Sequence, residues 1–222
     1  MVSPQLVRAL GEAPQQPDPK TAYQTILADI KTLSSRENIV EDLNAITDAI
    51  FDASLGVVDT RSTLTKLIET LRTLGHDAWI EVGQHVIDAI SSNAAVASSF
   101  HEEIAVIRSE LIATAYEQQE DYVEAAKALA EIPLDSSQRR LLDSDKVTIW
   151  IRIVRNYLEV DDSTTAETYL NKLKNVMHTI EDPEQLLHFK LSAARIQDSK
   201  RQFLACLTPC YGADRPGQEW RT

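Results

Sequence analysis

The side chains most able to do chemistry in this chain are few and scattered. Five histidines and two cysteines are present, at His76, His85, His101, His178, His188, Cys206 and Cys210. No two histidines form the His-x-His or His-Glu-x-x-His spacing that brings two zinc ligands to one helix face. Cys206 and Cys210 could share a helix face, but Pro209 argues against a helix there and no other ligand is near. The sequence therefore predicts no metal site.

The densest group of titratable residues is His101-Glu102-Glu103. A hydroxyl at Ser99 with a carboxylate three residues later, at Glu102, predicts a capping box at a helix start. We therefore interpret the three residues as helix capping and solvated charge rather than as ligands. The sequence contains neither a Gly-x-Gly-x-x-Gly nor a Walker loop for phosphates. Carboxylates are plentiful, but an acid/base pair depends on geometry and a shifted pKa. We predict no catalytic, cofactor-binding or metal residues.

Charge and composition exclude several classes of partner. The formal net charge of the 222 residues is −12, and basic clusters are only two residues long, as at Lys200-Arg201. A nucleic-acid binder needs larger Lys and Arg clusters to contact phosphates, whereas an acidic chain favours basic protein partners. No apolar run approaches the roughly 20 residues of a membrane helix. The first residues do not form a signal segment, and two cysteines so close together favour a reducing compartment. We expect a protein of the cytoplasm and nucleus without a small-molecule substrate.

The elements that would position these side chains all read as helices. Residues 1–18 carry three prolines and predict a flexible N-terminal extension. Asp18-Pro19 has the capping carboxylate and first-turn proline of a helix start. Apolar residues then recur at the helical period through a predicted arm of residues 19–203. Trp79 and Trp150 fall on these apolar stripes as core residues. Further helix starts are expected at Ser163 and Asp182-Pro183.

A repeat of about forty residues organises the second half of the chain. Asp121-Tyr122 precedes Ala125-Ala126, Asp161-Asp162 precedes Ala166-Glu167, and Arg201-Gln202-Phe203 falls at the same phase. A long helix, a polar turn and a second helix opening on small residues make one helical hairpin. Small residues there let two helix axes approach closely. The spacing predicts an all-α fold, a right-handed α-solenoid of TPR/HEAT-like hairpins, which usually presents surfaces to other proteins.

Several short stretches, in this order and with these gaps, resemble the subunit-four family of the COP9 signalosome, a PCI-domain family. They are Phe100-His101-Glu102-Glu103, Glu120-Asp121-Tyr122, Ile132-Pro133-Leu134, Ile153-Val154-Arg155-Asn156-Tyr157-Leu158-Glu159-Val160-Asp161-Asp162, Ala166-Glu167-Thr168-Tyr169-Leu170-Asn171-Lys172 and Ala194-Arg195-Ile196-Gln197-Asp198. The resemblance covers about half of the chain well, and residues 20–95 only by helical pattern.

This resemblance implies a non-catalytic scaffold whose helical arm contacts other signalosome subunits and cullin–RING ligase components. The complex removes the modifier Nedd8 from cullins, and a different, zinc-dependent subunit carries the chemistry. Exposed candidates for partner contact are Asp161-Asp162 and the loop 135–143, although a solvated turn explains both. A proteasome-lid subunit of the same architecture is the nearest alternative, and an all-α enzyme with a site between helices is the rival from another class.

The end of the chain departs from the family pattern. The family continues its helical repeat beyond Phe203 and then adds a C-terminal PCI winged-helix half, which we expect to be missing here. Residues 204–222 instead contain Pro209, Gly212, Pro216 and Gly217, which predict an irregular divergent tail. A shifted reading frame, a retained intron or an alternative transcript would produce such a tail, and a genuine lineage-specific end is the alternative. A truncated product with no stable function is therefore a third possibility.

Overall fold

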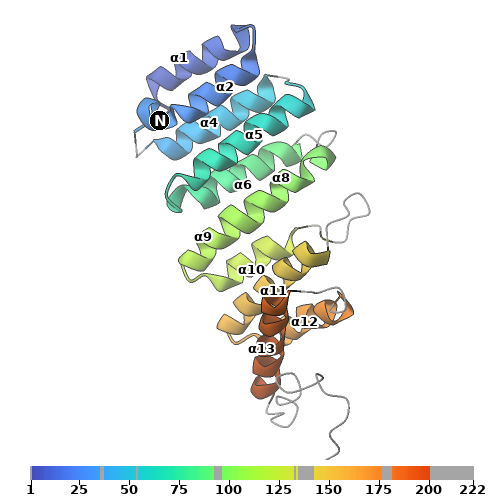
Figure 1. The fold of residues 1–222 in the computed structure, drawn as a ribbon. Helices are drawn as coiled ribbons and strands as arrows, with labels where there is room; N and C mark the ends of the chain where they lie inside the picture. The colour runs from blue at the N-terminus through green and yellow to red at the C-terminus, as the bar shows by residue number, and fades with distance from the viewer. Residues whose placement is uncertain are drawn as a thin grey trace, which may run out of the picture. The chain divides into compact units, whose positions relative to one another are not determined.

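The computed structural model describes residues 2–35, 38–53, 55–92, 97–132, 134, 143–176 and 182–200, and every regular element within them is helical (Figure 1). The predicted all-α class and its construction from helical hairpins are confirmed. The chain divides into two compact units, residues 1–120 and 121–222. None of the described helices is long and apolar enough to cross a membrane.

The first unit is built from helices that stack in two rows. Its elements are α1 (Pro4–Glu12), η1 (Ala13–Gln15), α2 (Pro19–Ala28), α3 (Ile30–Leu33), α4 (Ile39–Asp52), α5 (Val57–Arg72), α6 (Asp77–Ser92), η2 (Ser98–Phe100), α8 (His101–Val106), η3 (Ile107–Ile112) and α9 (Ala113–Gln118). In one row α1 packs on α4 and α4 on α6; in the other α2 packs on α5 and α5 on α8. Each row buries its apolar stripe against the other, so the core runs between them.

The start of α2 is the predicted one. The Asp18 carboxylate accepts hydrogen bonds from the Thr21 backbone N–H at 3.5 Å and from the Thr21 hydroxyl at 2.5 Å, and Pro19 occupies the first turn. The Thr21 hydroxyl bond is the main cause that lowers the pKa of Asp18 below its ordinary value of 3.8. The cap satisfies helix N–H groups that have no partner inside the helix.

The described part of residues 1–18 differs from the expected flexible extension. It contains α1 and η1, and Leu6 and Ala13 have no exposed surface. The Asp42 carboxylate, fully buried on α4, accepts hydrogen bonds from the backbone N–H and the hydroxyl of Ser3 at 2.8 and 2.7 Å. Pro4 fits the first helical position, so the same proline that suggested an irregular segment begins a helix.

The predicted capping box at Ser99 does not form. Phe100 precedes α8 with no side-chain cap, and the Ser99 carbonyl accepts a hydrogen bond from Arg61 on α5. Phe100 is 1% exposed and lies edge-to-face against Phe51, with ring centroids 6.5 Å apart. The buried Phe100 ring therefore fixes the chain where α8 begins.

A π-helical turn, η3, lies between α8 and α9 and packs against α6. Gly83 on α6 faces this turn. A methyl group on Gly83 would lie 3.0 Å from Ile112 Cγ1 and 3.2 Å from Ile107 Cγ2. Only a glycine therefore lets the α6 backbone approach η3 this closely without displacing the isoleucines.

The second unit packs three helices around α11. Its elements are α10 (Tyr122–Ala130), α11 (Asp143–Glu159), α12 (Ser163–Val176) and α13 (Pro183–Ser199). α11 contacts α10, α12 and α13, and α12 also contacts α13. Trp150 is 6% exposed, which confirms it as a core residue, as the 8% exposure of Trp79 does in the first unit. Asp182 caps α13 as predicted, accepting from the Glu184 N–H at 3.0 Å.

The repeat has a period of forty-one residues, measured between its two described turns. Among non-glycine described residues, Glu120 and Asp161 have positive φ, at 62° and 57°. An aspartate that caps the next helix follows each of them: Asp121 accepts from the Glu124 N–H at 3.3 Å, and Asp162 from the Thr165 N–H at 3.0 Å. Asp161 therefore corresponds to Glu120, not to Asp121, and Asp162 rather than Ser163 caps α12.

The small residues of the repeat lie in the core. Ala125, Ala126 and Ala166 have no exposed surface, in agreement with their predicted packing role. Ala125 and Ala166 are also forty-one residues apart. The third point of the repeat, residues 201–203, lies outside the described part of the chain.

Candidate protein-interaction surface

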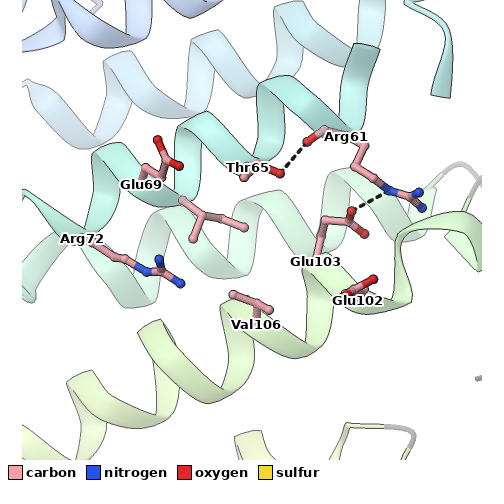
Figure 2. A pocket seen from close by; sticks show the side chains of 8 residues that line it. Arg61, Thr65, Glu69, Arg72, Glu102, Glu103 and Val106 are labelled. Atoms are coloured by element: carbon pink, nitrogen blue, oxygen red, sulfur yellow. Dashed lines mark hydrogen bonds and ion pairs between the residues drawn. The ribbon is translucent and has the colours of Figure 1, made fainter. Parts of the chain in front are cut away.

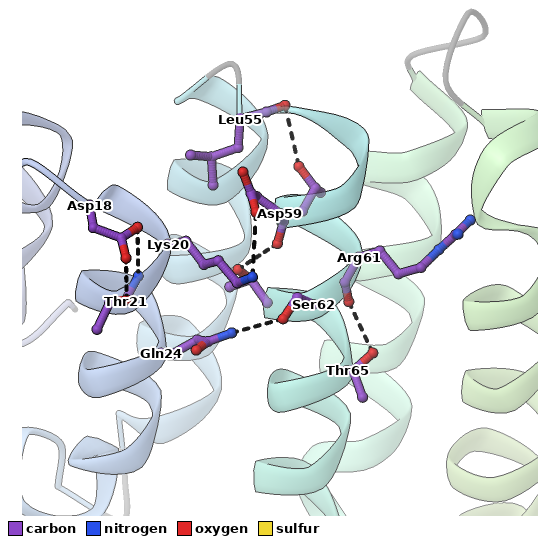
Figure 3. Close-up of polar contacts among 11 residues, drawn as sticks. Asp18, Lys20, Thr21, Gln24, Leu55, Asp59, Arg61, Ser62 and Thr65 are labelled. Atoms are coloured by element: carbon purple, nitrogen blue, oxygen red, sulfur yellow. Dashed lines mark hydrogen bonds and ion pairs between the residues drawn. The ribbon is translucent and has the colours of Figure 1, made fainter.

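Polar side chains link the neighbouring helices α2 and α5 (Figure 3). Lys20 on α2 pairs with Asp59 on α5 at 3.4 Å, and Gln24 donates to the Ser62 hydroxyl at 3.0 Å. The two pairs are separated by 39 and 38 residues in the sequence, about one helical hairpin. A further pair, Arg61 on α5 with Glu103 on α8, continues this polar face across the row, and we call it the α2–α5–α8 face.

A hollow of about 360 Å³ opens on this face between α5 and α8 (Figure 2). We call it the α5–α8 hollow and define it by its lining residues, Arg61, Thr65, Ile68, Glu69, Arg72, Glu102, Glu103 and Val106. Two arginines and three glutamates surround an apolar strip, so the hollow combines charge with hydrophobic wall.

Glu103 is a buried carboxylate in this hollow. The residue is 6% exposed, and its Oε1 lies 2.7 Å from Arg61 Nε. Its Oε2 is buried and has no hydrogen-bond partner within the described structure. The sequence-based interpretation of Glu103 as solvated charge is therefore wrong. Its place four residues before the core residue Ile107 was the signal for burial, because residues four apart share a helix face.

Arg61 and Arg72 on α5 each form an ion pair with a neighbouring element, Arg61 with α8 and Arg72 with η3. Besides Glu103, Arg61 donates to the Ser99 carbonyl, and its guanidinium carbon lies 6.0 Å from the centroid of the Phe100 ring. Arg72, eleven residues further along α5, pairs with Glu110. Each arginine side chain remains 47% exposed, but only the Arg72–Glu110 pair is exposed at both ends, where solvent screens it; the Glu103 end of the other pair is buried.

A second hollow, of about 280 Å³, lies on the other side of α5. It is lined by Leu27, Ala28, Ile30, Lys31, Lys66, Glu69, Thr70 and Thr73. Lys31 donates to the Thr73 carbonyl at 3.4 Å, and Lys66 pairs with Glu69 at 3.0 Å. Glu69 borders both hollows, so α5 forms a ridge between two recesses of the same face.

The second unit carries a pair of half-buried tyrosines. The rings of Tyr157 on α11 and Tyr169 on α12 stack with centroids 6.0 Å apart and an angle of 18° between their planes. Lys172 Nζ lies 4.9 Å from the centroid of Tyr169. Burial raises the pKa of the Tyr157 hydroxyl above its ordinary value of 10.0, so the ring stays neutral. The stacked rings contribute to the packing of α11 against α12.

Three of the described histidines each lie against a different neighbour. His76 packs on Trp79, His85 lies 2.8 Å from Asp48, and His188 lies 3.8 Å from Glu184. Within the described residues no three His, Cys, Asp or Glu side chains come together as metal ligands. His101 begins α8, and other sequence candidates lie outside the described residues; they are His178, Cys206, Cys210, Trp220 and residues 135–142.

The turn at Asp161-Asp162 divides its two carboxylates between different roles. Asp161 is exposed in its left-handed conformation, whereas Asp162 is half-buried as the cap of α12. Hydrogen bonds from the Thr165 side chain and backbone, in that order of size, lower the pKa of Asp162 below 3.8. The second carboxylate of this turn therefore holds the helix and is not free for a partner.

Comparison with known proteins agrees with the fold. The model of the family described as "PSMD12/CSN4, N-terminal" matches residues 6–211. A Neurospora crassa protein named COP9 signalosome complex subunit 4 is 46% identical over 95% of this chain and 52% of its own length. Proteins of the same name from Emericella nidulans and Dictyostelium discoideum are 42% and 36% identical, over 92% and 90% of this chain and 50% and 49% of their own lengths.

The chain spans about half the length of these curated relatives. The resemblance read from the sequence is confirmed by their names and by the family match. It also extends through residues 20–95, where the sequence alone supported it only by helical pattern. Because the match covers both helical units and nearly all described residues, the chain belongs to the PSMD12/CSN4 family through that family's N-terminal domain.

Proposed function

We propose that this chain is the helical arm of a COP9 signalosome subunit four and acts as a non-catalytic scaffold. The observation that carries the proposal is the family match over residues 6–211 together with relatives named COP9 signalosome complex subunit 4. In this role the chain binds other signalosome subunits and cullin–RING ligase components, and so takes part in cullin deneddylation without performing the chemistry. It works in the cytoplasm and nucleus.

The geometry supports a binding role for the first unit. Lys20–Asp59 links α2 to α5, and Arg61–Glu103, whose carboxylate is buried, links α5 to α8, so contacts across the helices order the α2–α5–α8 face. A face that is already ordered loses little conformational entropy when a partner binds. Its charge also fits the proposal, since a chain of net charge −12 attracts basic protein surfaces.

Affinity capture tests this proposal. The 222-residue chain, tagged and expressed in Neurospora crassa, is recovered from extract and the bound proteins are identified by mass spectrometry. We expect signalosome subunits and cullin–RING components to be enriched over an unrelated tagged helical-repeat protein of similar charge. Enrichment of chaperones alone would contradict the proposal and support a product without stable function.

A proteasome-lid role is the second candidate, because the description of the matching family names both PSMD12 and CSN4. The same capture separates the two. Lid subunits without signalosome subunits would assign the chain to the lid, whereas the three similar relatives, all named for the signalosome, favour the first outcome.

A further inference from the structure

The carboxylate of Glu103 in the α5–α8 hollow is only half satisfied. Arg61 Nε lies 2.7 Å from Oε1, but Oε2 is buried without a hydrogen-bond partner in the described structure. A buried charged acceptor without a donor is unfavourable, since its lost hydration is not replaced. Any donor that reaches Oε2 therefore gains more than it would at an exposed carboxylate.

The charges around the hollow select a cation for this position. Arg61 is engaged with Glu103, Arg72 with Glu110 and Glu69 with Lys66. Glu102, exposed at the rim, has no ion pair among those that the described residues form. The hollow thus has two unmatched acceptor groups, Glu102 and Glu103 Oε2, and no unmatched cation.

The shape of the hollow favours lysine over arginine. Ile68 and Val106 form an apolar strip beside the carboxylates, suited to the four-carbon stem of a lysine whose charged end stays at a polar site. A single free oxygen matches an ammonium, which acts as a point charge. A guanidinium is best matched by two acceptor oxygens side by side, and Arg61 already occupies Oε1.

We propose that the α5–α8 hollow binds a lysine side chain of a partner protein, with the ammonium at Glu103 Oε2 and the stem against Ile68 and Val106. Oε2 is shielded from bulk water, so entry requires the Glu103 carboxylate or the half-exposed Arg61 side chain to rotate. The inference rests on the proposed function to the extent that this face binds proteins.

Peptide titration followed by NMR tests the inference. The ¹⁵N-labelled full chain is titrated with acetyl-Gly-Lys-Gly-amide, with the neutral norleucine peptide of the same length, and with the arginine peptide. We expect the lysine peptide to shift the Arg61 Nε–H signal and the backbone amides of Glu103 and Val106. Its affinity should exceed that of the norleucine peptide by about tenfold, the gain of one charge-assisted hydrogen bond. Equal shifts with lysine and norleucine would overturn the proposal.

A matched pair of variants locates the site. Glu103→Gln should lower the lysine-peptide affinity about tenfold, whereas Glu81→Gln should leave it unchanged. Both remove one negative charge, but Glu81 is exposed on α6 and does not line the hollow. Equal affinity of the two variants would mean that the peptide responds to net charge alone, and the site would be rejected.

A tethered lysine gives a second test that needs no added ligand. Thr65 lines the hollow from α5, so Thr65→Lys can place its own ammonium among the carboxylates. We expect this change to raise the urea midpoint of unfolding in the wild-type background and not in Glu103→Gln. No difference between the two backgrounds would contradict the proposal. These tests do not depend on signalosome binding, so the capture experiment can fail or succeed independently of them.

Discussion

Ser3 and Asp42 are thirty-nine residues apart, yet the Asp42 carboxylate accepts hydrogen bonds from both the backbone N–H and the hydroxyl of Ser3. Asp42 has no exposed surface, so α4 supplies the cap that α1 lacks within its own first turn. The N-terminal helix is thereby held to the first unit by a polar contact as well as by Leu6.

Replacement of Asp42 should release this contact. Asp42→Ala removes two acceptors and leaves the buried Ser3 N–H unpaired, so we expect it to lower the free energy of unfolding by about 1–3 kcal/mol. Ser3→Ala keeps the N–H bond and should cost about 1 kcal/mol. Urea denaturation of both variants and of the double variant measures the coupling. Strictly additive effects would contradict a direct interaction.

Gly83 should tolerate no bulky side chain. Gly83→Leu would push into Ile107 and Ile112 and should destabilise the first unit by about 1–3 kcal/mol, the usual cost of overpacking. Gly11→Leu is the control, because Gly11 is exposed on α1 with nothing within 4 Å of an added Cβ. We expect the control to be neutral or stabilising. Equal unfolding midpoints for the two variants would show that α6 and η3 can move apart freely.

The two left-handed turn residues should gain stability as glycine. Glu120→Gly and Asp161→Gly remove the steric cost of positive φ and should each stabilise the chain by about 0.5–1 kcal/mol after the added entropy of the unfolded glycine. Glu120 should gain more, because aspartate tolerates this conformation better. Glu117→Gly, within α9, should instead cost about 1 kcal/mol. Thermal or urea unfolding gives all three values, and destabilisation at both turns would contradict their conformation.

The aspartate caps should give a dependence of stability on acid. The pKa of Asp18 and that of Asp162 are lower in the folded chain than the ordinary 3.8. Their contribution to stability is therefore fully present above that ordinary value and is lost as pH falls through the lowered folded value. NMR titration of the Asp162 carboxyl should show its pKa rising toward 3.8 in Thr165→Val, which lacks the side-chain hydrogen bond. An unchanged pKa in this variant would remove Thr165 as the cause.

Local sequence signals predicted the helices but not their partners. Asp18-Pro19 and Asp182-Pro183 begin α2 and α13 because a cap and a first-turn proline act within four residues. Ser99 failed as a cap because the burial of Phe100 against Phe51, a contact across forty-nine residues, decides the entry to α8. Pro4 suggested an irregular segment, because nothing near it in the sequence shows that Ser3 has its hydrogen-bond acceptor, Asp42, on a different helix.

The candidate site could not be predicted from the sequence either, because it too depends on contacts between residues that are far apart in the chain. Its lining comes from α5 and α8, and the pairing of Arg61 with Glu103 spans forty-two residues. The helical position of Glu103 indicated burial, but nothing local identified the arginine that makes burial of a carboxylate tolerable. The sequence predicted a repeat of forty residues, whereas the structure gives forty-one. The positive φ angles of Glu120 and Asp161 mark the equivalent turn positions, and these angles cannot be identified from the neighbouring residue types.

The π turn at Ile107–Ile112 has a consequence for chains of this family that differ in length. A π turn holds one residue more than the α-helix it interrupts. Because the wider turn takes up the extra residue, α8 and α9 keep the facing that an uninterrupted helix would give them. Ala113 and Ala115, both without exposed surface, therefore stay in the core that α9 shares with α6. Deletion of one residue within η3 should restore a regular helix without turning α9 away from α6, so a relative that is shorter by one residue here needs no matching change in the buried face of α9.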